Sequence, residues 1–179
     1  MLLSLQVHAD FSCDTDIALG TARLFGFDLM ENFKRPLLAK NVGDFWRRWH
    51  ISLSSWVNDY IFNPIALKQR SWGNWSIFYA LLISFIVIGI WHGAAWNYVL
   101  FGILQAMAII YETISKRFRR KISKKIPSGI YNITSILLTF LFVTLSLIVC
   151  RSGTFSEAMV TIRGIFSNHG ILFYEKPST

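Results

Sequence analysis

The feature that most constrains this chain is a stretch of 41 residues, 71–111, that contains no Asp, Glu, Lys or Arg. A single helix of that length would extend about 60 Å, roughly twice the thickness of the hydrocarbon core of a bilayer. The stretch must therefore turn back or break, and the break is marked by Gly89, Trp91, His92, Gly93 and Asn97. We expect two apolar helices, at about 75–91 and 94–111, short enough that re-entry or tilt stays open.

Composition agrees with a membrane protein. Hydrophobic residues make up 53% of the chain and charged residues 16%, whereas soluble domains contain about 45–50% and about 25%. The net charge is +8, and the basic residues flank the apolar runs. We therefore expect membrane lipid head groups, and no nucleic acid, as partners. Cys13 and Cys150 lie in unlike contexts, and no Cys/His cluster predicts a metal site.

A basic segment separates the apolar stretch from the next one. Seven cations lie within residues 116–125, and the positive-inside rule predicts a cytoplasmic loop over 112–129. The uncharged run that follows, 130–150, predicts a transmembrane helix that leaves on the opposite side.

The last part of the chain carries a helix start. Thr154 and Glu157 have the spacing of a capping box, and apolar residues recur after them at helical intervals. We therefore expect an amphipathic helix over 154–166 on the membrane surface, followed by a tail, 167–179, that carries little signal.

Residues 1–70 are less apolar and predict interfacial or re-entrant helices. Asn41 and Asp44 can cap a helix start, and an apolar stripe follows at helical spacing: Phe45, Trp49, Leu53, Trp56 and Tyr60. This pattern predicts one amphipathic helix that ends at Pro64. The apolar start of the chain lacks the basic segment and cleavage site of a signal peptide, so we expect a C-terminal part of a longer protein.

His92 is the sharpest candidate for chemistry. An ionisable side chain within an uncharged apolar stretch is costly and is by default a functional-site hypothesis. Burial would keep the imidazole neutral and able to accept a proton, and Gly89 and Gly93 would leave room for a substrate. The alternative is a histidine that packs between helices or lies at an interface in a belt with Trp91 and Trp96.

The other polar residues carry weaker signals. His50 lies beside Arg47 and Arg48, which is typical of a contact with lipid head groups. His8 and His169 have no local pattern. The acidic group Asp10, Asp14 and Asp16 fits no calcium loop and reads as a polar loop or helix cap.

Two segments together resemble a known family. The segment Asp44-Phe-Trp-Arg-Arg-Trp-His-Ile-Ser-Leu-Ser-Ser-Trp56, followed by Asp59-Tyr60, resembles a signature of the membrane-bound O-acyltransferases, and Gly89-Ile-Trp-His-Gly-Ala-Ala-Trp96 resembles their second signature. The resemblance is to the bacterial branch of alginate O-acetyltransferases and teichoic-acid D-alanyl transferases. It extends from about residue 8 to residue 166. The chain departs from the branch at Cys13-Asp14 and after Pro64, which bears on the substrate subfamily.

The resemblance implies an all-α, multi-pass transmembrane bundle, present here in part, with interfacial amphipathic helices and a tunnel for the substrates. It implies a bacterial inner-membrane enzyme that moves an acyl group, acetyl in the first instance, from a thioester such as acetyl-CoA or an acyl carrier to a hydroxyl of a cell-surface polysaccharide. It implies His92 and His50 as catalytic residues, no tightly bound cofactor or metal, and cell-envelope partner proteins. As substrate-binding residues we predict Trp46, Trp49, Ser54, Asp59, Trp91, Trp96 and Asn97.

Two other classes of function stay open. The chain could be a truncated, inactive remnant or a membrane scaffold subunit. It could also belong to a transporter in which His92 relays protons. Apolar segments encoded upstream of Met1 would argue against the remnant, and a flux assay against an acyl-transfer assay would separate transporter from transferase.

Overall fold

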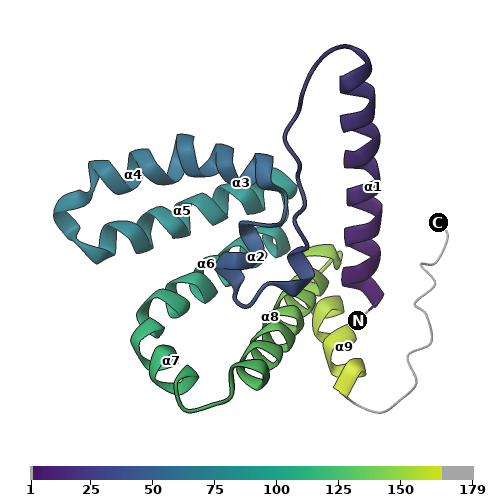
Figure 1. Cartoon of the computed structure of the whole chain (residues 1–179). Helices are drawn as coiled ribbons and strands as arrows, with labels where there is room; N and C mark the ends of the chain where they lie inside the picture. Colours follow the sequence, from purple (N-terminus) through teal and green to yellow (C-terminus); the bar gives the residue numbers. More distant parts are fainter. Residues whose placement is uncertain (1, 167–179) are drawn as a thin grey trace.

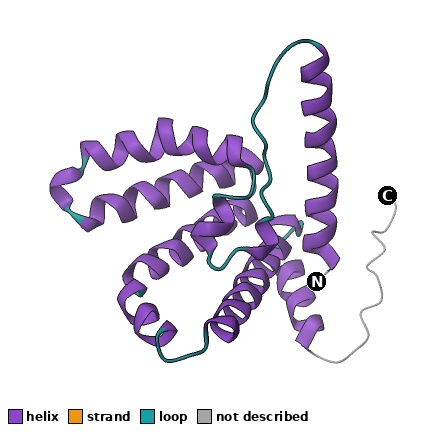
Figure 2. Cartoon of the chain, viewed as in Figure 1, coloured by secondary structure: helices purple, strands orange, loops and turns teal. Residues whose placement is uncertain are grey.

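The protein is built from helices. A computed structural model describes residues 2–166, and within them the only extended pairing is an isolated bridge between Phe33 and Trp49. Figure 2 shows helices joined by turns and by one long loop after the first helix. The expected all-α class is confirmed for the described chain.

The elements follow one another in this order along the chain. They are α1 (Leu2–Leu24), η1 (Pro36–Leu38), α2 (Val42–Trp46), α3 (Ile51–Val57), η2 (Asn58–Phe62), α4 (Asn63–Lys68), η3 (Arg70–Trp72), α5 (Asn74–His92), α6 (Trp96–Ile114), α7 (Lys116–Ser123), α8 (Ser128–Arg151) and α9 (Phe155–Phe166). In Figure 1, α3 and α4 run beside α5, α6 and α8 pack against each other, and α1 stands at the other side of α8.

Among the described residues, three helices have the length and composition to cross a membrane. They are α5 and α6, with 19 residues each, and α8, with 24 residues. The charge-free stretch therefore breaks where its small and polar residues predicted, between His92 and Trp96. The ends of all three helices lie within a few residues of the predicted ones.

Close backbone contact joins α5 to α6. A Cβ atom on Gly89 would overlap the carbonyl oxygen of Tyr98, and one on Gly102 would overlap the carbonyl oxygen of Phe85. Helices in lipid associate through such small residues because packing has to replace the hydrophobic driving force of water. The hairpin of α5 and α6, which has His92 at its bend, therefore depends on two glycines.

Buried polar side chains join the other helices. Gln105 of α6 is completely buried and donates from Nε2 to the Ser146 hydroxyl of α8 over 2.7 Å. Ser4 of α1 and Thr144 of α8 share a hydrogen bond of 2.6 Å. Each contact satisfies a polar group that would be costly to leave unpaired among apolar residues.

The single helix predicted from Asn41 to Pro64 is wrong. The chain leaves helical geometry between Trp46 and Ile51, and Pro64 lies in the first turn of α4 instead of ending a helix. A proline lacks the N–H that an uninterrupted helix would use there, and the π-helical turn η2 stands directly before α4.

The basic segment is a helix and not an open loop. Helix α7 follows α6 after one residue, Ser115. Arg119 of α7 donates from Nη2 to the carbonyl oxygen of Glu112 at the end of α6, over 2.9 Å. Arginine near a helix C-terminus stabilises the unpaired carbonyls there, which ties α7 back to α6.

The predicted start of the last helix is confirmed. The Thr154 hydroxyl accepts from the amide of Glu157 over 3.3 Å, and the Glu157 carboxylate accepts from the amide of Gly153 over 3.0 Å. The second bond reaches one residue further back than a standard capping box. The predicted tail, 167–179, and His169 lie outside the described residues.

Asp10, Asp14 and Asp16 lie along α1 and are exposed, instead of forming a loop or cap. Within residues 2–166 no group of three or more His, Cys, Asp or Glu side chains has the arrangement of a metal site.

Candidate active site

The first histidine segment begins with a short, firmly capped helix. Asn41 accepts the amide of Asp44 on its side-chain oxygen over 2.7 Å, as predicted. The carboxylate of Glu112, 70 residues away, accepts the amides of Val42 and Gly43 over 2.6 and 3.1 Å. An anion at a helix N-terminus is favoured by both hydrogen bonding and the helix dipole. The end of α6 therefore fixes the start of α2.

The charges on α2 also stabilise its N-terminus. Burial raises the pKa of Asp44, but the hydrogen bond from Arg48 and the nearby cations outweigh it, so the net pKa is lowered. Arg48 Nε donates to the Asp44 carboxylate over 3.1 Å. The carboxylate is thus charged in the first turn of α2, where a negative charge is stabilising.

His50 stands where the chain turns between α2 and α3. Its backbone is left-handed, with φ 47° and ψ 55°, which is uncommon for a residue other than glycine. Three bonds to the preceding loop hold the turn: Lys34 N–H to the Arg48 carbonyl, Ile51 N–H to the Asn32 carbonyl, and Ser52 N–H to the Asn32 side chain. The turn therefore interrupts the single helix that the apolar stripe had predicted.

Aromatic rings surround the imidazole of His50. Its centroid lies 4.8 Å from that of Phe11 on α1 and 5.8 Å from that of Trp91 on α5. The Ser52 hydroxyl lies 3.5 Å from its Nδ1. Burial, and next the proximity of His92, lower the pKa of His50. The neutral imidazole is therefore the favoured form.

His92 is the last residue of α5. Its ring lies 5.0 Å from Trp91 and 6.2 Å from Phe101, centroid to centroid, and it lines a cavity of about 280 Å³. The side chain is exposed in the described chain, and the enclosed, dry position expected for it stays a prediction. Helix α5 ends at this residue, which leaves the ring at the end of the helix.

Hydrogen-bonded side chains form part of the cavity wall. Trp46 Nε1 donates to the side-chain oxygen of Gln105 over 3.1 Å, and Gln105 donates to Ser146. Trp46, Trp49 and Gln105 line the same cavity as His92. The cavity therefore lies where the first histidine segment, α5, α6 and α8 meet.

The structure separates the other predicted binding residues. Ser54 lines a second cavity, of about 500 Å³, with Trp46. Trp91 contacts His50 but is 60% exposed, and Trp96 is 86% exposed beside a different cavity of about 180 Å³. Their exposure at the helix ends suits the interfacial belt that was the alternative for this segment. Asp59 is exposed on η2 and does not line the cavity beside His92.

Asn97 has a structural contact. Its side-chain nitrogen donates to the backbone carbonyls of Cys150 and Ser152, over 3.1 and 2.8 Å. These carbonyls stand at the end of α8, where the helix leaves them without an internal partner. The amide nitrogen of Asn97 is therefore engaged in closing α8.

Sequence reasoning missed most of the residues that line this cavity. Gln105, Phe11 and Tyr98 line the cavity with His92. Gln105 could have been found, since an amide in an apolar span needs a partner. Phe11 and Tyr98 look like ordinary core residues in the sequence. His8, which had no pattern, packs at 5.4 Å from Phe33 and 5.7 Å from Trp49, and burial lowers its pKa.

A helical membrane protein in which two histidine segments meet, with His92 lining a cavity and His50 against the neighbouring Trp91, is the class that this fold and site define. The profile of the membrane-bound O-acyltransferase family matches residues 1–154. The chain belongs to that family.

Curated relatives agree with this assignment. The chain is 30% identical to the peptidoglycan O-acetyltransferase of Helicobacter pylori over 94% of its length and 33% identical to a probable alginate O-acetylase of Pseudomonas syringae over 90%. It is 34% identical to the teichoic acid D-alanyltransferase of Bacillus subtilis over 78%. The matched parts cover 31%, 30% and 37% of those proteins, so the chain spans about a third of their length.

Proposed function

We propose that this protein is an O-acyltransferase of the bacterial inner membrane that moves an acyl group from a thioester to a hydroxyl of a cell-surface polysaccharide. The names of the relatives support the reaction type, since each describes transfer of an acetyl or D-alanyl group. The observation that carries the proposal is the meeting of the two histidine segments. Trp91 contacts the ring of His50, and its neighbour His92 lines the cavity.

In this proposal His92 is the general base. A neutral hydroxyl is a weak nucleophile, so His92 takes its proton as the oxygen attacks the thioester carbonyl. The new C–O bond forms, the C–S bond breaks, and the imidazolium returns the proton to the departing thiolate. A positioned base of this kind contributes about 10²–10⁴-fold. The chain's own residues supply every proton transfer in this scheme, and it uses no metal.

His50 is assigned a supporting role at the same site. Its lowered pKa keeps the ring neutral, so one ring nitrogen can donate a hydrogen bond and the other can accept one. Such a donor can stabilise the negative charge that develops on the carbonyl oxygen. Trp46 and Trp49 form apolar walls of the cavity, which would limit the competing attack by water.

The donor and acceptor follow from the relatives' chemistry. We propose acetyl as the acyl group, acetyl-CoA or an acyl-carrier thioester as the donor, and a cell-envelope glycan as the acceptor, with partner proteins completing the modification. Supplying labelled acetyl and D-alanyl thioesters in parallel tests this part. Transfer of the D-alanyl group alone would move the protein to the teichoic-acid side of the family.

Replacing His92 by Ala tests the general-base assignment. We expect acyl transfer by the purified native protein to fall by about 10²–10⁴-fold while its melting temperature changes little. Trp75→Ala is the matched control, because Trp75 is exposed at the opposite end of the same helix. Near wild-type turnover by His92→Ala would overturn the assignment. For His50→Ala we also expect a large loss; a raised KM for the donor with unchanged kcat would make it a binding residue.

A further inference from the structure

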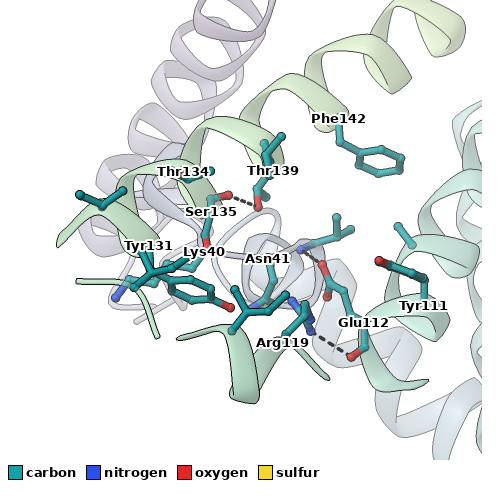
Figure 3. Close-up of a pocket in the computed structure, with 16 residues that line it drawn as sticks. Lys40, Asn41, Tyr111, Glu112, Arg119, Tyr131, Thr134, Ser135, Thr139 and Phe142 are labelled. Atoms are coloured by element: carbon teal, nitrogen blue, oxygen red, sulfur yellow. Dashed lines mark hydrogen bonds between the residues drawn. The ribbon is translucent and has the colours of Figure 1, made fainter. Parts of the chain in front are cut away.

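A further cavity, distinct from those lined by Ser54 and Trp96, lies away from the histidines. It has a volume of about 450 Å³ and is enclosed by the residues before α2, the end of α6, α7 and the first half of α8. Figure 3 shows its lining side chains, with Lys40 and Tyr131 towards the left, Arg119 beside Glu112 below, and Phe142 at the upper right. It shares no lining residue with the cavity beside His92.

The polar end of this cavity is positively charged. Its single carboxylate, that of Glu112, already accepts the amides of Val42 and Gly43. Arg119 uses one nitrogen on the Glu112 carbonyl, and its buried Nε has no hydrogen-bond partner among the described residues. Neither Lys40 nor Arg119 forms an ion pair within residues 2–166. Two cationic residues thus line the cavity, and its lining carboxylate is already hydrogen-bonded.

The opposite walls are apolar and open towards the side of the bundle. Ile126, Ile130 and Leu138 line the cavity and are 37%, 59% and 63% exposed. Ile130 and Leu138 belong to α8, a helix apolar enough to cross a membrane. A ligand that fits both ends therefore carries a negative charge on one side and hydrocarbon on the other.

The surroundings strengthen the positive potential. Helix α7 carries further cations beside the cavity, and none of residues 116–125 is acidic. Under the positive-inside rule this end of the bundle faces the cytoplasm, and the cytoplasmic leaflet is the one rich in anionic lipid. Basic pockets between transmembrane helices on that side are typical binding places for anionic head groups.

We propose that this cavity binds one anionic phospholipid. Lys40 and Arg119 bind the phosphate, the cavity holds the glycerol region, and the acyl chains continue along the exposed face of α8. The lipid would join α2, α6, α7 and α8 at the point where Glu112 anchors the first histidine segment. This inference does not depend on acyl transfer, because its residues are separate from the candidate active site.

Lipid retention by the purified native protein tests the proposal. The protein is reconstituted in nanodiscs that contain phosphatidylglycerol and phosphatidylcholine, and bound lipid is measured by native mass spectrometry. We expect selective retention of phosphatidylglycerol, and a loss of affinity of about fivefold for each of Lys40→Gln and Arg119→Gln, the effect of one basic residue near a membrane surface. Arg117→Gln is the matched control, since it removes the same charge from α7 outside the cavity lining.

A second pair of variants blocks the cavity without changing charge. Ile130→Trp fills its mouth, whereas Ile133→Trp places the same bulk at a residue of α8 that is 61% exposed and outside the lining. We expect only Ile130→Trp to displace the lipid. Equal losses in Arg117→Gln and Arg119→Gln, retention by Ile130→Trp, or no preference for phosphatidylglycerol would overturn the proposal. Equal competition by free glycerol phosphate would also overturn it, because the apolar walls would then contribute nothing.

Discussion

The two histidine segments reach the same place by different physical means. The His50 segment consists of short helices held by capping bonds, by the Glu112 carboxylate and by backbone pairing with the loop before it. The His92 segment is the end of a long apolar helix held to α6 by backbone contact at Gly89 and Gly102. Hydrogen bonds fix the turn in the His50 segment, whereas close packing of the backbones fixes the apolar helices. The two segments should therefore respond to different substitutions.

The largest expected effect comes from Gly102→Ala. A methyl group there meets the backbone carbonyl of Phe85, and backbone cannot give way as a flexible side chain can. We expect the protein to lose at least about 3 kcal/mol of stability, the upper end for overpacking, measured as a fall in melting temperature and in folded yield. Gly129→Ala is the control, because no atom lies within 4 Å of a Cβ there. Equal behaviour of the two variants would contradict the role assigned to close packing.

Glu112→Ala should disturb the other segment. It leaves the amides of Val42 and Gly43 without their acceptor, at a cost of about 1–3 kcal/mol. Hydrogen exchange of residues 42–49 should then become faster while the α5–α6 hairpin keeps its protection. Glu112→Gln keeps one acceptor oxygen and should recover part of the loss, and Thr113→Ala on the exposed side of α6 serves as control. Equal acceleration in both segments would mean that the two are not held independently.

This contrast also explains what the sequence could predict. The spans α5, α6 and α8 could be predicted because a charge-free run has few ways to fold in a bilayer. The caps at Asn41 and Thr154 could be predicted because they depend on neighbours three residues away. These signals depend on residues close together in the sequence, and the structure follows the predictions made from them.

The turn at His50 could not be predicted. The apolar stripe continues through it, and Phe45 and Trp49 are buried as the stripe requires, but Trp56 and Tyr60 are 53% and 69% exposed. The left-handed turn is fixed by Asn32, about 20 residues earlier in the chain. The anchoring of α2 by Glu112 is likewise invisible in the sequence, since 70 residues separate the carboxylate from the amide it accepts.

The left-handed backbone at His50 gives a sharper test of the polar segment. His50→Ala and His50→Gly remove the same imidazole, so they should lose activity to the same extent. The Ala variant keeps a Cβ in a conformation that costs about 1–2 kcal/mol, whereas glycine adopts it freely. We expect His50→Gly to unfold at the higher temperature. A more stable Ala variant would show that the turn relaxes once the ring is removed.

The smallest expected effect is the dependence of stability on pH, which comes from titratable groups in and beside the His50 segment. The pKa of His50 in the folded protein lies below its ordinary value of 6.5, because of burial and the proximity of His92. The unfolded chain then binds the proton first, so the contribution of His50 to stability is fully present above pH 6.5 and is lost as pH falls through the lowered value. His8 shifts in the same direction, while Asp44 acts at a lower pH, below its ordinary value of 3.8.

Replacing His50 by Asn, which tolerates a left-handed backbone and does not titrate, isolates this contribution. Melting temperatures measured at intervals from pH 7 to about 5 should fall less steeply for His50→Asn than for the wild type, with the remaining slope reduced further in the double variant with His8→Phe. Identical slopes in the wild type and His50→Asn would mean that the imidazole is solvated in both states. The aromatic rings of Phe11 and Trp91 would then not exclude water from it, and the neutral form assumed for the supporting role of His50 would lose its physical basis.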